Sequence, residues 1–274
     1  MEVSTSPVSI DDCYFYHTID LPGIGTIEGE WDLRAGAHNY IGKVDVKGKT
    51  VLEMGTANGF LSFYMEQQGA DVISYDLSPE FDWDVVPYAS KKVANFAQAR
   101  KNHIRQINNA YRFCHNALQS KARPVHGTVY DIPSTIGLVD ITTFGSILLH
   151  VENPFRALHQ ASIITKETII VTDIIDNQRQ LLFNKLFGWM GNSWVRRIRS
   201  KILGPSMIFR PVASVGHPEE TWWHLTPELI EEYLRVLGFA DITFSYHQQP
   251  FVQHDKTHFL YTIVAKRTQP IITS

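Results

Sequence analysis

From residue 49 onward, short apolar runs alternate with longer segments whose apolar residues recur every three or four positions. The short runs are typical of buried strands, and the recurring spacing is typical of amphipathic helices. Strands that alternate with helices in this way indicate a parallel sheet covered on both faces. The expected strands are KTVLEMG (49–55), ADVISYD (70–76), PVHGTVYD (124–131), VDITTFG (139–145) and ETIIVTD (167–173).

Helical patterns fill the connections between these strands. We expect one helix at 59–68, a second at 153–164 and a long one between the second and third strands. The long helix is indicated by apolar residues that share one helix face, namely Val93, Ala97, Ile104, Ile107, Tyr111, Cys114 and Leu118.

The C-terminal part differs from this alternation. TPELIEEYLRVLGFA (226–240) predicts a helix that is capped by Thr226, begins at Pro227 and stops before Gly238. DITFSYH (241–247) and THFLYTIVAKR (257–267) predict an antiparallel pair at the sheet edge. The predicted fold class is therefore α/β, a Rossmann-like doubly wound sheet of seven strands, five parallel and then a C-terminal antiparallel hairpin.

The chain divides by composition into four parts. Residues 1–48 are rich in aromatic residues, glycine and acids and are expected to cover a ligand site, while 49–176 form the binding core. Residues 177–225 predict a helical insertion or lid, and 226–274 complete the core. The N-terminus lacks a secretory signal and no apolar run approaches the length of a spanning helix, so we expect a soluble, cytoplasmic protein. The two cysteines offer neither a metal-ligand spacing nor a disulfide framework.

The stretch VLEMGTANGFLSF (51–63) joins the first strand to the first helix. It breaks at Gly55 and Gly59, with Glu53 two residues before the first glycine. This spacing is not the three-glycine dinucleotide fingerprint, so a ligand cradle and a plain tight turn both remain open. Asp76, which ends the second strand, can accept both hydroxyls of a ribose, and Asp131 at the end of the third can accept from an adenine amino group. Three acids at successive strand ends favour a neutral or cationic adenosine ligand.

These motifs resemble those of the S-adenosylmethionine-dependent methyltransferases with a seven-stranded α/β sheet. The similar stretches are VLEMGTANG, VISYD, GTVYDIP and FGSILLHVENPFRAL. They are most similar to the branch that contains the tRNA wobble-uridine-modifying enzymes and related small-molecule methyltransferases. The resemblance covers about residues 25–175 well and 220–266 loosely. It implies S-adenosylmethionine as cofactor and methyl transfer as the reaction, and no metal.

The resemblance also implies roles for single residues. Met54 and Thr56 depart from the usual residues of the first motif, at positions that tolerate change. The implied cofactor-binding residues are Glu53, Gly55, Thr56 and Gly59 at the methionine end, Asp76 at the ribose, Leu77 or Trp83 along the adenine, Tyr130 and Asp131 at the adenine ring and amino group, and Gly145 and Ser146 near the sulfonium.

Methyl transfer from a sulfonium requires two positioned reactants, and an oxygen nucleophile also needs a general base. His150 follows the fourth strand and is a candidate base, with a purely structural role as the alternative. His224 and His17 are further catalytic candidates, because each lies in an aromatic stretch that could form a substrate pocket. The alternative for both is a partly buried histidine with a backbone partner. Arg34 could pair with the cofactor carboxylate or form a surface salt bridge.

The insertion bears on the identity of the acceptor. Within it, the stretch 181–203 carries the basic residues Lys185, Arg196, Arg197, Arg199 and Lys201. It fits a lid over the pocket, a helix at 181–203 in contact with a membrane interface, an RNA contact, or a helix simply packed on the sheet. The net charge of −3 disfavours a nucleic-acid partner. We expect a methyltransferase of a small-molecule acceptor, most simply at oxygen. The alternatives are a tRNA- or RNA-modifying enzyme of the wobble-uridine type and a non-catalytic scaffold that binds the cofactor.

Overall fold

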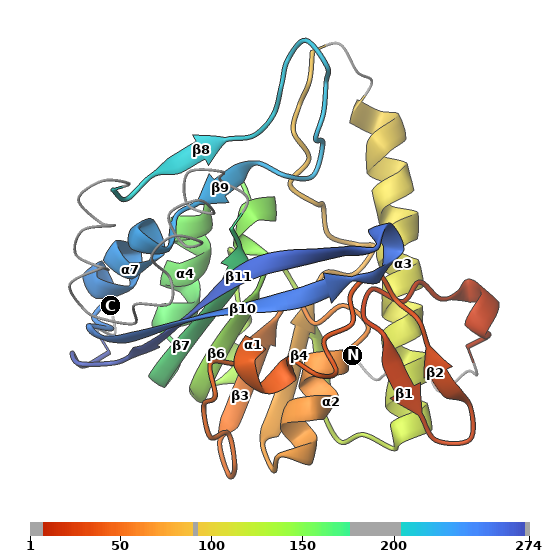
Figure 1. Ribbon diagram of the computed structural model, residues 1–274, viewed down its shortest axis with the longest axis horizontal. Coiled ribbons are helices and arrows are strands. Elements are labelled where there is room, and N and C mark those ends of the chain that lie inside the picture. Colours follow the sequence, from red (N-terminus) through yellow and green to blue (C-terminus); the bar gives the residue numbers. More distant parts are fainter. Residues whose placement is uncertain (1–7, 90–92, 176–203, 272–274) are drawn as a thin grey trace.

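A single seven-stranded sheet forms the centre of the molecule (Figure 1). The computed structural model describes residues 8–89, 93–175 and 204–271. Five neighbouring strands run parallel, and β11 runs antiparallel to both β7 and β10. The predicted fold class is thereby confirmed. In the order of the sheet the strands are β10 (Asp241–Phe251), β11 (Lys256–Lys266), β7 (Thr165–Ile174), β6 (Val139–Gly145), β3 (Thr50–Met54), β4 (Asp71–Asp76) and β5 (Arg123–His126).

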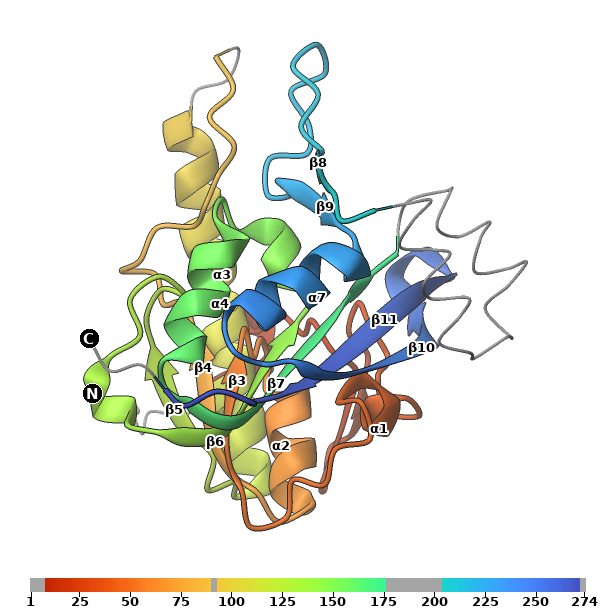
Figure 2. The ribbon, with the colours of Figure 1, turned by 90° about the vertical axis from the view of Figure 1, so that its left-hand side faces the viewer.

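Helices cover both faces of this sheet (Figures 1 and 2). Successive side chains of a strand point to opposite faces, so Val51 packs into one buried cluster and Leu52 into the other. The first cluster lies under α1 (Ala37–Tyr40), α2 (Phe60–Gln67) and α3 (Val93–Leu118). The second lies under α4 (Pro154–Ser162) and α7 (Pro227–Val236). Short 3-10 turns occupy Ile10–Asp12, Ser134–Ile136, Leu148–His150 and Val252–His254.

The ends of α7 follow the sequence signals closely. Thr226 Oγ1 accepts a hydrogen bond from the Leu229 backbone N–H (3.3 Å), and Pro227 is the first helical residue. Gly238 lies beyond the last turn with a φ of +88°. The predicted cap, start and stop are therefore confirmed.

The third strand is shorter than predicted. β5 ends at His126, whereas the sequence pattern extends to residue 131. At Gly127 the chain leaves the sheet, where its N–H donates to the Asp76 carbonyl (3.0 Å) and the Tyr75 hydroxyl donates to the Thr128 carbonyl (2.8 Å). Residues 127–131 thus wrap around the Tyr75 side chain, and Asp131 lies exposed beyond the strand.

Two small strand pairs lie outside the main sheet. β1 (Ile19–Leu21) pairs with β2 (Gly25–Ile27), and β8 (Met207–Phe209) pairs with β9 (Trp223–Leu225). The expected helical insertion spans 177–225, of which 177–203, with the five basic residues named above, lie outside the described residues. The remainder, 204–225, is a hairpin rather than a helix. Among the described helices, none combines the length and apolar character needed to span a membrane.

Candidate functional site

Two adjoining cavities open at the carboxyl ends of β3, β4 and β6. The main cavity has a volume of about 250 Å³ and the side cavity about 120 Å³. This edge of an open α/β sheet is where such folds bind their ligands. Five residues line both cavities and therefore mark the junction between them: Gly55, Asp76, Trp83, Ile147 and His150.

The cradle turn between β3 and α2 needs its glycines. Gly55 has a φ of +79°, and a Cβ placed on it would lie 2.3 Å from Cγ2 of Ile147. Gly59 has a φ of +87°, and its added Cβ would lie 2.5 Å from the Phe63 ring. Glycine at these positions lets the backbone pass close to the cavity wall in a left-handed conformation. The turn therefore forms part of the cavity and also the start of α2.

Asp76 fixes this turn from the end of β4. Its Oδ2 accepts from the Ala57 backbone N–H (2.7 Å) and its Oδ1 from the Leu77 N–H (2.7 Å). Desolvation raises the pKa of this half-buried carboxyl, and the two backbone hydrogen bonds act in the opposite direction. The carboxylate is thus held in one orientation at the junction of both cavities.

Glu53 and Thr56 lie beneath the turn rather than in the two cavities. Glu53 is buried and accepts hydrogen bonds from Thr56 Oγ1 (2.9 Å) and from the Ser62 hydroxyl. Desolvation raises the pKa of Glu53 to about 7, although these donors favour its charged form. Gly59 likewise caps α2 and does not line either cavity. These three residues therefore support the turn, and their predicted contact with the cofactor stays a prediction.

The end of β6 is closed by the N-terminal segment. Ser146, with a φ of +52°, has its hydroxyl 3.2 Å from the Tyr40 hydroxyl. A Cβ on Gly145 would lie 3.1 Å from Cε1 of Tyr40. All three residues line the main cavity. The predicted pair Gly145 and Ser146 therefore lies against Tyr40 of α1 in the cavity wall.

The side cavity is lined mainly by apolar and aromatic groups. Leu77 and Trp83 form part of one wall, and Tyr130 forms part of another. The Tyr130 hydroxyl donates to the Asp84 carboxylate and accepts from the Asn153 N–H (3.1 Å), which holds the ring in place. Val129 and Tyr130 still line this cavity, whereas the next residue, Asp131, is exposed and does not.

His150 lies at the junction and has a defined tautomer. Its Nδ1 is 2.6 Å from the backbone carbonyl oxygen of Glu220. A carbonyl oxygen only accepts, so Nδ1 carries the proton and Nε2 is left with a free lone pair in the neutral ring. Burial lowers the pKa of this histidine below its ordinary value of 6.5. The side chain is thus a neutral base near pH 7.

The N-terminal segment supplies a wall of the main cavity. The His17 backbone N–H donates to Asn58 Oδ1 (2.7 Å), and Asn58 Nδ2 donates to the His17 carbonyl (3.0 Å), so this segment is tied to the cradle turn. Burial lowers the pKa of His17 to about 3, which keeps its ring neutral. The same wall rests on the last strands, since the Val252 N–H donates to the Glu30 carbonyl (2.7 Å).

Several residues of the main cavity were not singled out from the sequence, including four charged or aromatic ones. They are Glu30, Trp31, Arg100 and Glu220, and they come from three separate regions of the chain. In the sequence, the only indication of these residues was the aromatic and acidic character of the stretches around 30 and 220. The four residues come together only in the tertiary fold, which the sequence pattern does not show.

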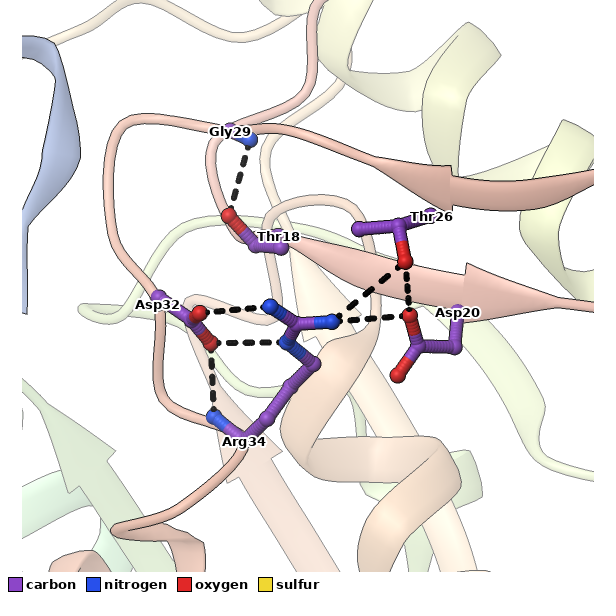
Figure 3. Close-up of polar contacts among 6 residues, drawn as sticks. All are labelled: Thr18, Asp20, Thr26, Gly29, Asp32 and Arg34. Carbon is purple, nitrogen blue, oxygen red and sulfur yellow. Dashed lines mark hydrogen bonds and ion pairs between the residues drawn. The ribbon is translucent and has the colours of Figure 1, made fainter.

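Two further predicted residues lie away from both cavities. Arg34 is exposed and pairs with Asp32 (2.7 Å) and Asp20 (2.8 Å), while the nearby Thr18 hydroxyl accepts from the Gly29 N–H (Figure 3). Of its two predicted roles, the structure shows the surface salt bridge. His224 is buried in β9 and lines a separate cavity that also contains Asp173. The described residues contain no group of three or more His, Cys, Asp or Glu side chains placed to hold a metal ion.

Comparisons with known proteins give matches among solved structures. No protein-family model matches the chain, and no curated protein matches it. Magnesium protoporphyrin IX methyltransferase from Synechocystis PCC 6803, with bound SAH, is 13% identical with a TM-score of 0.50, over 86% of this chain and 82% of that one. A SAM-dependent methyltransferase from Methanosarcina mazei is 15% identical with a TM-score of 0.51, over 85% and 97%.

A third similar structure is the N-terminal domain of EvdMO1 in the presence of SAH and D-fucose. It is 14% identical with a TM-score of 0.50, over 93% of this chain and 91% of that one. At such identities the likeness concerns the fold. The strand order and these neighbours together show that the chain has the Rossmann-like fold of the S-adenosylmethionine-dependent methyltransferases.

Proposed function

We propose that the protein is an S-adenosylmethionine-dependent methyltransferase that acts on a small-molecule acceptor at oxygen. The observation that carries this proposal is the set of residues at the junction of the main and side cavities. Asp76, held by two backbone N–H groups, and His150, a neutral base, line the same two cavities beside the glycine turn.

The residues around the junction fit the proposed cofactor. The fixed carboxylate of Asp76 suits ribose hydroxyls, and the apolar side cavity along Leu77, Trp83 and Tyr130 suits an adenine ring. The backbone turn at Gly55 and the end of β6 at Gly145 and Ser146 would hold the methionine half. When bound, S-adenosylmethionine supplies an electrophilic methyl group. Two of the similar structures contain SAH, the product that remains after the methyl group has left.

His150 would act on the acceptor. Its Nε2 would accept the proton of an acceptor hydroxyl when that hydroxyl lies beside the methyl group that the cofactor supplies. The lowered pKa keeps the imidazole unprotonated at neutral pH, so it does not have to lose a proton first. Tyr16 and Trp31 also line the main cavity, and their rings would exclude water from the reacting groups.

The charges of the main cavity support a small, non-polyanionic acceptor. Glu30, Asp76 and Glu220 line it, and among its described lining residues Arg100 is the single arginine or lysine. A phosphate backbone would meet acids here rather than the basic groove that RNA requires. The wobble-uridine role remains the second proposal from the sequence resemblance, and salt-dependent binding of tRNA would distinguish it.

Calorimetry with S-adenosylhomocysteine tests the cofactor assignment. We expect saturable binding with one site per chain, and its absence would overturn the proposed function. Release of S-adenosylhomocysteine from S-adenosylmethionine in the presence of candidate hydroxyl, amine and tRNA acceptors then identifies the acceptor class. Tight cofactor binding without transfer to any acceptor would instead support a non-catalytic scaffold.

A further inference from the structure

A chain of two polar contacts leads from α3 to His150. Arg100 Nη2 on α3 lies 3.1 Å from Glu220 Oε2, and the backbone carbonyl oxygen of Glu220 lies 2.6 Å from His150 Nδ1. Glu220 thus contacts one residue through its side chain and the other through its main chain. All three residues line the main cavity.

The guanidinium of Arg100 is itself held in place. It lies over the Phe96 ring, 4.8 Å from its centroid, and over the Trp83 ring, 5.7 Å from its centroid. The side chains of Arg100 and Glu220 are 23% and 30% exposed, so their ion pair is partly shielded from solvent. A side chain that is already ordered by stacking loses less conformational entropy when it forms an ion pair.

Neighbouring contacts fix the position of the segment around Glu220 but do not touch its carbonyl. The Val86 N–H donates to the Glu219 carbonyl (2.9 Å), and the Trp222 N–H donates to the Leu149 carbonyl (2.9 Å). The peptide unit that follows Glu220 lies between these two anchors, and neither of the two hydrogen bonds involves it. The ion pair with Arg100 restrains the residue at this point and thereby aims its carbonyl oxygen at the imidazole.

We propose that Arg100 and Glu220 are positioning residues that hold His150 as the Nδ1–H tautomer. The two neutral forms of an imidazole differ in which nitrogen keeps a lone pair, and the hydrogen-bond partner of one nitrogen selects the form. In this arrangement Nε2 is the basic atom at the junction. The catalytic meaning of this tautomer rests on the proposed function, whereas the tautomer itself is a property of the chain.

Nitrogen-15 NMR of the full chain, labelled at the histidine rings, measures the tautomer directly. Comparison with the spectrum of His150→Asn assigns the His150 resonances. We expect one Nδ1–H form in the parent protein. Arg100→Met and Glu220→Ala should shift both ring nitrogen resonances toward the values of a tautomer mixture. Glu220→Gln, which can still accept from the guanidinium, should keep the parent spectrum.

Lys101→Met is the matched control. Lys101 is the next residue on α3 and pairs with Asp82 (3.3 Å), but this ion pair has no contact with Glu220 or His150. Its removal should leave the His150 resonances unchanged. If Arg100→Met does not fold, Arg100→Lys serves the same test, because it keeps the charge but loses the flat guanidinium, and we expect a smaller shift of the same sign.

An unchanged Nδ1–H tautomer in folded Glu220→Ala, or in folded Arg100→Met or Arg100→Lys, would overturn the proposal. A parent protein that carries the proton on Nε2 would overturn it as well. Binding of S-adenosylhomocysteine, measured on the same samples, reports separately on the proposed function. A parent protein that shows the expected tautomer but does not bind S-adenosylhomocysteine would refute the function and leave the positioning role in place.

Discussion

The carboxylate of Asp76 accepts a hydrogen bond from the backbone N–H of Ala57, 2.7 Å away and 19 residues earlier in the chain. Ala57 has a φ of +50°, in the left-handed region, so this bond stabilises a backbone conformation that a non-glycine residue adopts at a cost. The residue at the end of β4 therefore shapes the turn at the end of β3. One side chain couples the proposed ribose site to the proposed methionine site.

Asp76→Ala should weaken the binding of S-adenosylhomocysteine by about 10- to 100-fold, since a hydrogen bond to a charged group contributes roughly 1.5–3 kcal/mol. Isothermal titration calorimetry measures the effect. Asp71→Ala, at the exposed start of the same strand, is the control and should bind as the parent does. Unchanged affinity of Asp76→Ala would contradict the cofactor site.

His150→Asn should lower the turnover of an identified acceptor by about 10²- to 10⁴-fold, which is the usual contribution of a general base. The affinity for S-adenosylhomocysteine should change little. His159→Asn, exposed on α4, is the control. In the parent protein the rate should fall with decreasing pH only below the ordinary histidine value of 6.5, because burial lowers the pKa of His150. Near-normal turnover of His150→Asn would remove it as the base.

Gly55→Ala should destabilise the fold by about 2–4 kcal/mol, because it adds both a left-handed alanine and a Cβ that overlaps Ile147. Gly23→Ala separates the two effects. Gly23 has a similar φ of +73° but nothing within 4 Å of an added Cβ, so it should lose about 1–2 kcal/mol from the backbone alone. Urea unfolding of the two variants gives the difference. Equal losses would show that Ile147 moves aside.

Glu53→Gln should change how the free energy of unfolding depends on pH. Burial raises the pKa of Glu53 from its ordinary value of 4.5 to about 7, so its stabilising contribution is complete below pH 4.5 and is lost as the pH rises through about 7. The variant lacks this loss. Relative to the parent it should therefore gain on the order of 2–3 kcal/mol between pH 4.5 and 8. Glu28→Gln, at an exposed position, is the control, and its free energy of unfolding should depend on pH as that of the parent does.

Arg34→Met tests the assignment of Arg34 to the surface. Its ion pairs with Asp20 and Asp32 are solvent-exposed, so their removal should cost no more than about 1 kcal/mol of stability. The affinity for S-adenosylhomocysteine should stay within about twofold of the parent, since the side chain lies outside both cavities. A tenfold loss would mean that Arg34 reaches the cofactor in solution.

The strands and helices of the core could be predicted because their signals are local. The apolar run of β3 and the cap at Thr226 depend on neighbours within a few residues. The end of β5 could not be predicted, because it depends on the Tyr75 hydroxyl, which draws the chain out of the sheet from another strand. The β-branched and aromatic residues that predict a strand continue to residue 131, although β5 ends at His126.

The residues of the candidate site could likewise be predicted only where their signals are local. The positions of Gly55 and Asp76 at one edge of the sheet could be predicted, because a tight turn and a strand end have their own residue preferences. The partner of His150 was not found, since it is a backbone carbonyl 70 residues away and any residue type could supply it. From the sequence, Arg34 could pair with the cofactor carboxylate or form a surface salt bridge. The structure shows the salt bridge, with Asp32 only two residues away.

The N-terminal wall of the main cavity depends on a part of the chain that is synthesised much later than the wall itself. Trp31 packs on Phe251, with ring centroids 4.7 Å apart, and the Asp32 N–H donates to the Pro250 carbonyl (3.1 Å). On the ribosome, residues 14–40 therefore emerge more than two hundred residues before the strand on which they rest. The nascent chain can form β3 to β7 and the cradle turn early, but the cavity becomes closed on this side only when β10 and β11 have left the exit tunnel.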